Sequence, residues 1–184
     1  MALSVENHDF PQSPLTIVVM GVSGVGKTTL ARLLADRLAL PFAEADDFHP
    51  AANIAKMSDG IPLDDEDRAP WLRAIGAWLK ERAEAGTGGV VTCSALKHRY
   101  RDILRADAPG AFFLHLSGGH ELVEDRLSHR TGHFMPTSLL DSQYATLEPL
   151  GADECGAALD VGPSPEELVE MAVALLRPVN GDLA

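Results

Sequence analysis

The sequence predicts an α/β fold in which helices cover both faces of a parallel sheet. Short apolar runs alternate along the chain with amphipathic stretches, and most runs lead directly into a segment with helical spacing. Strands are expected at residues 15–20, 42–45, 89–93, 111–116 and 157–161. Helices are expected at residues 28–39, 67–85, 97–106, 121–129 and 164–176.

Two of the expected helices have a clear apolar face. In the helix at 28–39, four leucines fall on one side, namely Leu30, Leu33, Leu34 and Leu38. The helix at 67–85 ends at Gly86 and carries a single apolar stripe. This stripe consists of Trp71, Leu72, Ile75, Trp78 and Leu79. We interpret both tryptophans as core residues, because they lie on the apolar side of the helix.

The two ends of the chain carry different signals. Residues 1–14 contain prolines and no periodic pattern, so we expect a flexible arm before a single domain of residues 15–184. The last helix has a well-defined start. Ser164 can cap it, Pro165 suits the first helical position, and Glu167 completes a capping box.

Composition restricts the class of protein. With 184 residues, of which 46% are hydrophobic, the chain can bury one full core. Its 15 Lys and Arg against 27 Asp and Glu give a formal charge of −12, which argues against a general nucleic-acid binder. No apolar run reaches the roughly 18 residues of a membrane span, and residues 1–14 lack a signal-peptide pattern. The two cysteines, Cys93 and Cys155, are too few for a disulfide scaffold, so we expect a cytoplasmic protein with free thiols.

A phosphate-binding motif follows the first expected strand directly. Residues 21–28 match the P-loop pattern G-x-x-x-x-G-K-[ST] and open a helix. Such glycines let backbone N–H groups point at phosphates, and the helix start adds its positive dipole end. We expect Lys27 to reach the β- and γ-phosphates of a nucleoside triphosphate and the Thr28 hydroxyl to bind Mg²⁺. The expected nucleotide-binding residues are Gly21, Val22, Ser23, Gly24, Val25, Gly26, Lys27, Thr28 and Thr29.

Carboxylates are expected beside this loop at the end of the second strand. Strand 89–93 runs into Ser94 without an acidic residue, whereas Glu44, Asp46 and Asp47 follow the second strand. On an extended strand Glu44 and Asp46 share a face. We assign Glu44 to the Mg²⁺ shell and Asp46 to the proton of an attacking hydroxyl, as phosphoryl transfer to an alcohol requires. A solvated acidic loop is the alternative.

A basic segment at 126–133 predicts a lid at about residues 126–136. Arg126 and Arg130 are four residues apart at the end of a helix and would share one face. There they could bind the nucleotide and neutralise the charge of the transferring phosphoryl group, which makes them candidate catalytic residues with Lys27 and Asp46. A solvated helix end is the alternative. The sequence lacks the guanine-reading Asn-Lys-x-Asp segment, which argues against a GTPase switch.

Further motifs occur in a fixed order along the chain. The first group is His49-Pro50, Asn53, Lys56-Met57, Gly60-Ile61-Pro62-Leu63-Asp64, Asp67-Arg68 and Pro70-Trp71-Leu72. The second group is Cys93-Ser94-Ala95-Leu96-Lys97, Tyr100-Arg101-Asp102, Arg130-x-Gly132-His133-Phe134, Gln143-x-x-x-Leu147-Glu148 and Gly151-Ala152-Asp153-Glu154. Together these motifs resemble those of the bacterial and eukaryotic gluconokinase family, and the resemblance covers residues 15–176.

This resemblance implies a fold, an oligomeric state and a reaction. It implies an adenylate-kinase-like, three-layer P-loop fold with a five-stranded parallel sheet in the order 2-3-1-4-5. It also implies a homodimer that transfers phosphate from ATP to the 6-hydroxyl of D-gluconate. Two positions depart mildly from the family, because Glu44 stands where many relatives have Asp and Thr28 replaces a frequent Ser. Both residues keep the required chemical group.

A sugar acid requires a cation for its carboxylate and polar groups for its hydroxyls. We therefore assign substrate contacts to Arg68, Lys97 and Arg101, with Asp46 at the reacting hydroxyl and His49 and His133 as polar neighbours. Each cation could instead lie on the surface, and Arg68 could pair with the acidic run before it.

Other readings of the motifs remain open. A shikimate-type or other sugar-acid kinase would use the same P-loop, although a shikimate-type enzyme is expected to show a triple-glycine turn where this chain has residues 93–97. A nucleotide-binding regulator without turnover would keep Lys27 and Thr28 but would not need Asp46. Cys93 lacks a visible activating base, so we interpret it as a small residue at a strand end.

Overall fold

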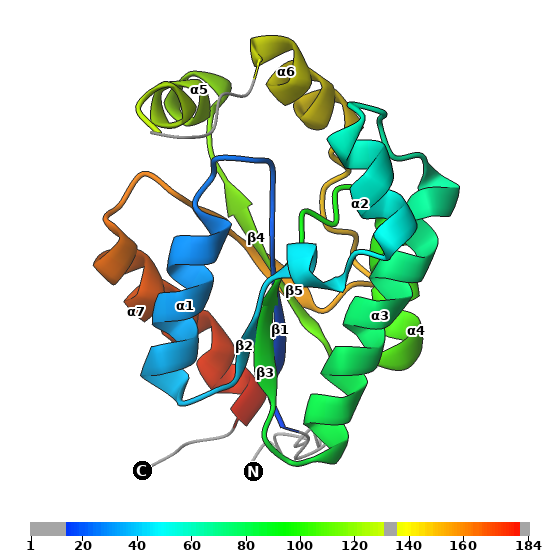
Figure 1. Cartoon of the computed structure of the whole chain (residues 1–184). Coiled ribbons are helices and arrows are strands. Elements are labelled where there is room, and N and C mark those ends of the chain that lie inside the picture. The colour runs from blue at the N-terminus through cyan, green and yellow to red at the C-terminus, as the bar shows by residue number, and fades with distance from the viewer. Residues whose placement is uncertain (1–13, 131–135, 181–184) are drawn as a thin grey trace, which may run out of the picture.

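Five strands form one parallel sheet in the order β2-β3-β1-β4-β5 in the computed structural model, which describes residues 14–130 and 136–180 (Figure 1). The strands are β1 (Thr16–Met20), β2 (Phe42–Ala43), β3 (Gly89–Thr92), β4 (Phe112–Ser117) and β5 (Gly156–Asp160). Every neighbouring pair is parallel. The expected fold class and strand order are therefore confirmed.

Helices cover both faces of this sheet, as Figure 1 shows. Helices α1 (Lys27–Leu38) and α7 (Pro165–Asn180) lie on one face and contact one another. On the other face α3 (Asp65–Glu84) packs against α4 (His98–Asp107). The expected capping box at the start of α7 is present, because the backbone N–H of Ser164 donates to Glu167 and that of Glu167 donates to Ser164.

The alternation of β1 divides the core into two layers. Ile17 and Val19 pack toward α1 and α7, whereas Val18 and Met20 pack toward α3 and α4, and all four side chains are 0% exposed. Each such buried side chain contributes about 1.5–3 kcal/mol of hydrophobic stabilisation. A strand buried on both faces holds its ends rigidly, which matters because the phosphate-binding loop follows β1.

The remaining helices lie beyond the carboxyl ends of the strands (Figure 1). They are the 3-10 helix η1 (Ala45–Phe48), α2 (Ala51–Ser58), α5 (His120–Ser128) and α6 (Thr137–Thr146). The sequence patterns predict only α5 among them. Among the described helices, none is both long and apolar enough to cross a membrane.

Strand order brings three loops together. β1 pairs with β3, and β3 pairs with β2, so the segments that follow these strands meet at one edge of the sheet. Those segments are residues 21–26, 44–50 and 93–97. The expected arm lies outside the described residues except for Pro14.

Candidate active site

The loop after β1 has the backbone shape of an anion cradle. Gly24 and Gly26 adopt φ values of +80° and +104°, in the left-handed region that disfavours side chains. A Cβ at Gly24 would also lie 2.5 Å from the side chain of Leu127 in α5. Because α1 begins at Lys27, the free N–H groups of its first turn are available to an anion.

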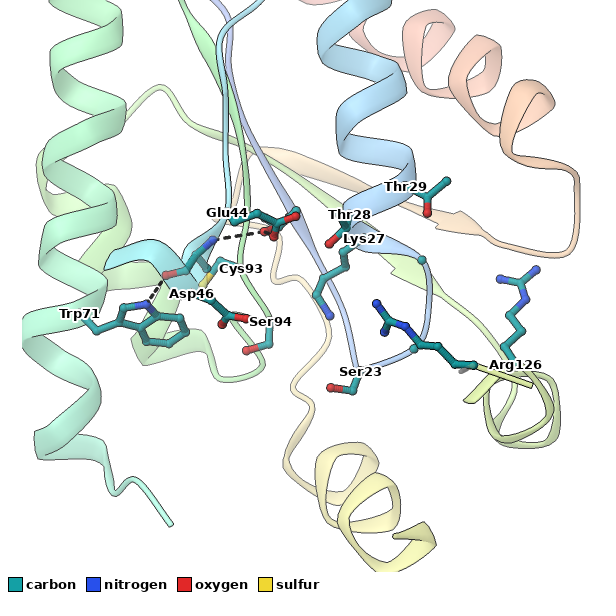
Figure 2. Close-up of a pocket in the computed structure, with 15 residues that line it drawn as sticks. Ser23, Lys27, Thr28, Thr29, Glu44, Asp46, Trp71, Cys93, Ser94 and Arg126 are labelled. Atoms are coloured by element: carbon teal, nitrogen blue, oxygen red, sulfur yellow. Dashed lines mark hydrogen bonds between the residues drawn. The ribbon is translucent and has the colours of Figure 1, made fainter. Parts of the chain in front are cut away.

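A cavity of about 410 Å³ opens beside this loop. We call it the donor cavity, and Figure 2 shows it. Its lining residues are Ser23, Gly24, Gly26, Lys27, Thr28, Thr29, Glu44, Ala45, Asp46, Trp71, Thr92, Cys93, Ser94, Arg126 and Arg130. Most of the residues that the sequence assigns to nucleotide binding, metal binding or proton transfer thus line this one cavity. Gly21, Val22 and Val25 belong to the loop but do not line the cavity.

Lys27 is held inside the curve of the loop. Its Nζ donates to the carbonyl oxygens of Gly21 and Val22, at 3.0 Å each. Burial lowers the pKa of Lys27 to about 8, although the nearby carboxylates of Asp46 and Glu44 oppose this shift. An anion bound beside Lys27 would favour the charged amine and raise this pKa.

Glu44 is anchored to the end of β3. The Thr92 hydroxyl donates to Glu44 Oε2 at 2.6 Å and accepts from the backbone N–H of Ala45 at 3.3 Å. Figure 2 shows the Thr28 hydroxyl pointing toward Glu44 across the cavity. A hydroxyl and a carboxylate are oxygen donors of the kind that Mg²⁺ takes, so this pair fits a hard divalent cation.

Asp46 reaches the donor cavity by a different route from the one expected. β2 ends at Ala43, and Asp46 lies within η1 rather than on an extended strand. Glu44 and Asp46 therefore share the cavity because the chain turns after β2, and not because of strand alternation. Figure 2 shows Asp46 and Ser94 on one side of the cavity, with Lys27 facing them.

Trp71 fixes the turn that carries Asp46. Its indole N–H donates to the carbonyl of Ala45 at 2.7 Å, and its side chain is 5% exposed, as expected of a core residue. His49 stacks on Trp71 with 4.4 Å between ring centroids and lies 3.4 Å from the Asn53 amide nitrogen. Burial lowers the pKa of His49. His49 is absent from the described lining of both cavities.

The two arginines of the expected lid differ in how they are held. Arg126 donates to the carbonyls of Val161 at 2.6 Å and Val25 at 3.4 Å, which ties α5 to the phosphate-binding loop. Arg130 lines the donor cavity close enough for its charge to lower the pKa of Lys27. Part of the expected lid, including His133, lies outside the described residues.

A second cavity, of about 380 Å³, shares Ser94 with the first. We call it the acceptor cavity. Its lining residues are Leu63, Asp64, Asp65, Arg68, Ser94, Leu96, Lys97, Tyr100, Leu139, Ser142, Gln143 and Thr146. Lys97 Nζ lies 3.2 Å from Asp65 Oδ1, and both Arg68 and Lys97 lie over the ring of Tyr100. Two of the three cations assigned to the substrate therefore line a polar cavity beside the donor site.

The structure corrects the expectation for Arg101. This side chain is 0% exposed and lines neither cavity among the described residues. Its guanidinium pairs with Glu154, 53 positions further along the chain, instead of facing a substrate. Cys93 is also buried, and burial raises the pKa of its thiol to about 12, which leaves it protonated and without nucleophilic character at neutral pH.

Comparison with known proteins agrees with this geometry. A sequence model of the shikimate kinase family matches residues 23–145. The chain is 55% identical to a gluconokinase of Gluconobacter oxydans, over 77% of this chain and 79% of that protein. It is 38% identical to the thermoresistant gluconokinase of Escherichia coli, over 95% of this chain and 98% of that protein. The chain belongs to the gluconokinases.

Solved structures place the gluconokinases within a wider fold family. A gluconokinase structure from Sinorhizobium meliloti has a TM-score of 0.78 and 48% identity, and the match covers 90% of this chain and 93% of that chain. A shikimate kinase structure from Aquifex aeolicus has a TM-score of 0.55 at 15% identity, covering 88% and 96%. The second likeness concerns the fold alone, so the match to the shikimate kinase family model reports the shared P-loop kinase architecture.

Several residues of this gluconokinase site escaped assignment from the sequence. Gln143 of α6 accepts the backbone N–H of Ser23 at 2.7 Å and lines the acceptor cavity, so it touches both halves of the site. The others are Thr92, which orients Glu44, and Asp65 and Tyr100, which line the acceptor cavity. Only the family motifs around Tyr100 and Gln143 could have suggested two of them. In the sequence, Thr92 cannot be told apart from any other β-branched residue of a buried strand, so it was not assigned to the site.

Proposed function

We propose that the chain transfers the γ-phosphoryl group of ATP to the 6-hydroxyl of D-gluconate, giving 6-phospho-D-gluconate and ADP. The observation that carries this proposal is the pair of adjoining cavities that share Ser94. One has a phosphate-binding loop, and the other has two cations. Membership in the gluconokinases, at 38–55% identity to two named enzymes, supports D-gluconate as the acceptor.

On the donor side, the backbone N–H groups of residues 21–29 bind the phosphates of ATP. Lys27 exchanges its carbonyl partners for the β- and γ-phosphates and carries a positive charge when they are bound. Arg126 keeps α5 against the loop, and Arg130 neutralises the charge that spreads over the transferring oxygens.

Thr28 and Glu44 are the residues that would hold Mg²⁺. Both line the donor cavity, and the hydrogen bond from Thr92 orients the Glu44 carboxylate. A bound Mg²⁺ supplies positive charge to the phosphate oxygens of the nucleotide. The preference of Mg²⁺ for oxygen ligands supports this assignment.

In the transfer step Asp46 accepts the proton of the attacking hydroxyl. A bond forms between the 6-oxygen of gluconate and the γ-phosphorus, the bond from that phosphorus to the bridging oxygen breaks, and ADP leaves with the electron pair. Asp46 is exposed to the donor cavity, so an acceptor hydroxyl can reach its carboxylate.

On the acceptor side, Arg68 and Lys97 attract the carboxylate of the sugar acid. Ser94, Tyr100 and Ser142 offer hydroxyls to its polar chain. We propose that His49 acts through Trp71, which fixes the turn that carries Asp46, rather than by direct contact with the substrate, because the two rings stack. His133 stays a candidate polar neighbour from the sequence motif.

The test is a coupled assay of ADP release with several acceptors, in which Mg²⁺ is varied. D-gluconate, other aldonic acids, shikimate and nucleoside monophosphates are compared at equal concentration. We expect turnover with D-gluconate that depends on Mg²⁺. Turnover with another acceptor and none with gluconate would refute the assignment of the substrate, and ATP binding without any turnover would favour a regulator. The family resemblance also supports a homodimer, which sedimentation velocity would detect.

A further inference from the structure

The loop of residues 93–97 holds a conformation that its own sequence disfavours. Ala95 has a φ of +44°, in the left-handed region, although it is not a glycine. This conformation costs roughly 1–2 kcal/mol for a residue with a Cβ. The same loop carries Ser94 and Lys97, which line the acceptor cavity. Something outside the loop must therefore hold it in place.

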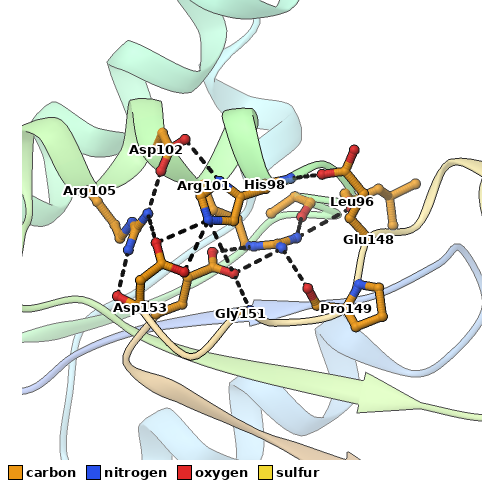
Figure 3. A network of polar contacts seen from close by, with 11 residues as sticks. Leu96, His98, Arg101, Asp102, Arg105, Glu148, Pro149, Gly151 and Asp153 are labelled. Carbon is orange, nitrogen blue, oxygen red and sulfur yellow. Dashed lines mark hydrogen bonds and ion pairs between the residues drawn. The ribbon is translucent and has the colours of Figure 1, made fainter.

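Arg101 of α4 provides that hold. Its Nη1 donates to the carbonyls of Ala95 at 2.8 Å and Leu96 at 3.3 Å. Its Nη2 donates to the carbonyl of Pro149 at 3.2 Å and to Glu154 Oε2 at 3.1 Å, and its Nε donates to Glu154 Oε1 at 2.6 Å. These bonds use all five N–H groups of the guanidinium, as Figure 3 shows.

Glu154 and Glu148 complete the support from the segment between α6 and β5. Glu154 is fully buried on its side-chain atoms, and its Oε2 also accepts the backbone N–H of Gly151 at 2.8 Å. Glu148 holds the loop on its other side, because its backbone N–H donates to the carbonyl of Leu96 at 2.8 Å and its carboxylate accepts the N–H of His98 at 2.6 Å. The loop is thus fixed from both directions.

Two other readings of this cluster are less consistent with its chemistry. His98, Asp153 and Glu154 bring three potential metal ligands together, yet Arg101 and Arg105 already pair with these carboxylates and would repel a cation. A purely stabilising role is also a weak explanation, because desolvating a buried ion pair offsets much of its attraction. What an arginine fork does supply is fixed geometry.

We infer that Arg101 is a positioning residue, which sets the acceptor site by holding loop 93–97 so that Ser94 and Lys97 face the acceptor. This inference rests on the proposed function, since it assumes that the second cavity binds the acceptor. Among the described residues the guanidinium makes no hydrogen bond to the P-loop, whose Gly21 N–H instead donates to the carbonyl of Ser94 at 3.3 Å, so we expect the larger effect on the acceptor side.

The deciding variant is Arg101→Lys. Lysine keeps a positive charge for Glu154 but has three N–H donors and no planar fork, so the loop loses part of its support. We expect kcat/KM for the acceptor to fall about 10- to 100-fold, mostly through KM, because small misplacements of binding groups are costly. The Kd for ATP, measured by calorimetry, should stay within about twofold.

Arg105→Lys is the matched control. Arg105 lies one turn further along α4 and pairs with Asp102 and Asp153, and among the described residues it makes no hydrogen bond to loop 93–97. Its acceptor kinetics should match the wild type. Should Arg101→Lys fail to fold, Glu148→Ala weakens the support on the other side, because it removes the carboxylate that accepts the His98 N–H directly after the loop and keeps the backbone bond to Leu96, so the acceptor KM should rise by a smaller factor.

Equal loss of acceptor and ATP affinity, or an unchanged acceptor KM in a folded variant, would overturn the inference. Wild-type turnover with gluconate is measured first. If the wild type uses a different acceptor, the proposed substrate fails, and the comparison of variants is made with that acceptor. The two failures are therefore distinguished.

Discussion

The donor and acceptor cavities are built in different ways. Under the proposed function, the phosphate-binding groups of the donor cavity come from one continuous stretch, residues 21–29, six of which line it, and are mainly backbone N–H groups. The acceptor cavity takes side chains from α3, the 93–97 loop, α4 and α6. A binding site made of backbone needs a particular turn, whereas one made of side chains needs every contributing element to be in place.

The largest expected effect tests Asp46, which lines the donor cavity. Asp46→Asn keeps the size of the side chain but removes the basic oxygen, so phosphorylation should fall by a factor on the order of 10² to 10⁴. The Kd for ATP should change little, because we assign nucleotide binding to residues 21–29. Single-turnover phosphorylation and calorimetry on the same folded variant measure both quantities.

Asp47→Asn is the control for this variant, because Asp47 is an exposed neighbour that does not line the donor cavity in the described chain. Wild-type turnover in Asp46→Asn would remove Asp46 from the mechanism. The proton-accepting role would then pass to Glu44, which also lines the donor cavity.

The second prediction concerns charge on the donor side. Arg130→Ala should lower kcat by a factor on the order of 10², because removing one stabiliser of transition-state charge has costs of that size. ATP affinity should weaken much less. Arg37→Ala, which removes an exposed arginine of α1 paired with Glu170, should match the wild type in steady-state kinetics. Unchanged kcat in Arg130→Ala would make Arg130 a surface cation.

The third prediction follows from the lowered pKa of Lys27, about 8 in the free protein. Phosphates raise this pKa, so ATP binding takes up protons when the free amine is partly neutral. Affinity for ATP should therefore fall as pH rises above about 8, by at most tenfold per pH unit. Calorimetry at pH 7 and 9, in buffers of different ionisation enthalpy, measures the uptake. Lys27→Arg should abolish it, and equal uptake in both proteins would exclude Lys27 as its source.

The smallest expected effect tests whether Arg101 maintains the left-handed conformation of Ala95 on the acceptor side. Ala95→Gly removes the cost of the left-handed φ, so in an Arg101→Lys background it should recover about fivefold in acceptor KM, equivalent to about 1 kcal/mol. The double variant is compared with Arg101→Lys alone. A further rise in KM would mean that the conformation of Ala95 is not what Arg101 maintains.

The contrast between the cavities also explains what the sequence could predict. The fold class and the P-loop are apparent from the sequence, because apolar runs that alternate with amphipathic stretches indicate the first and one motif indicates the second. The strand order was implied by the family resemblance alone. Arg101 illustrates the limit. A cationic side chain within a family-like motif suggests a binding site for an anion. The neighbouring sequence gives no sign that Arg101 is instead buried in an ion pair with Glu154, 53 positions away. The turn at Asp46 was missed for a similar reason, because Trp71 fixes it from another helix.

The pairing of β1 with β3 has a consequence for how this architecture can diversify. The phosphate-binding loop leaves β1 and the acceptor loop leaves β3, and the N–H of Gly21 donates to the carbonyl of Ser94 at 3.3 Å. Neighbouring strands lie about 4.8 Å apart whatever their side chains are. The pairing of β1 with β3 thus sets how far apart the two loops leave the sheet. Under the proposed function, substitutions of acceptor-cavity residues on α3, α4 or α6 can change which small molecule is phosphorylated. The strand pairing that places the two loops side by side does not depend on those residues, so specificity can evolve while the catalytic geometry is kept.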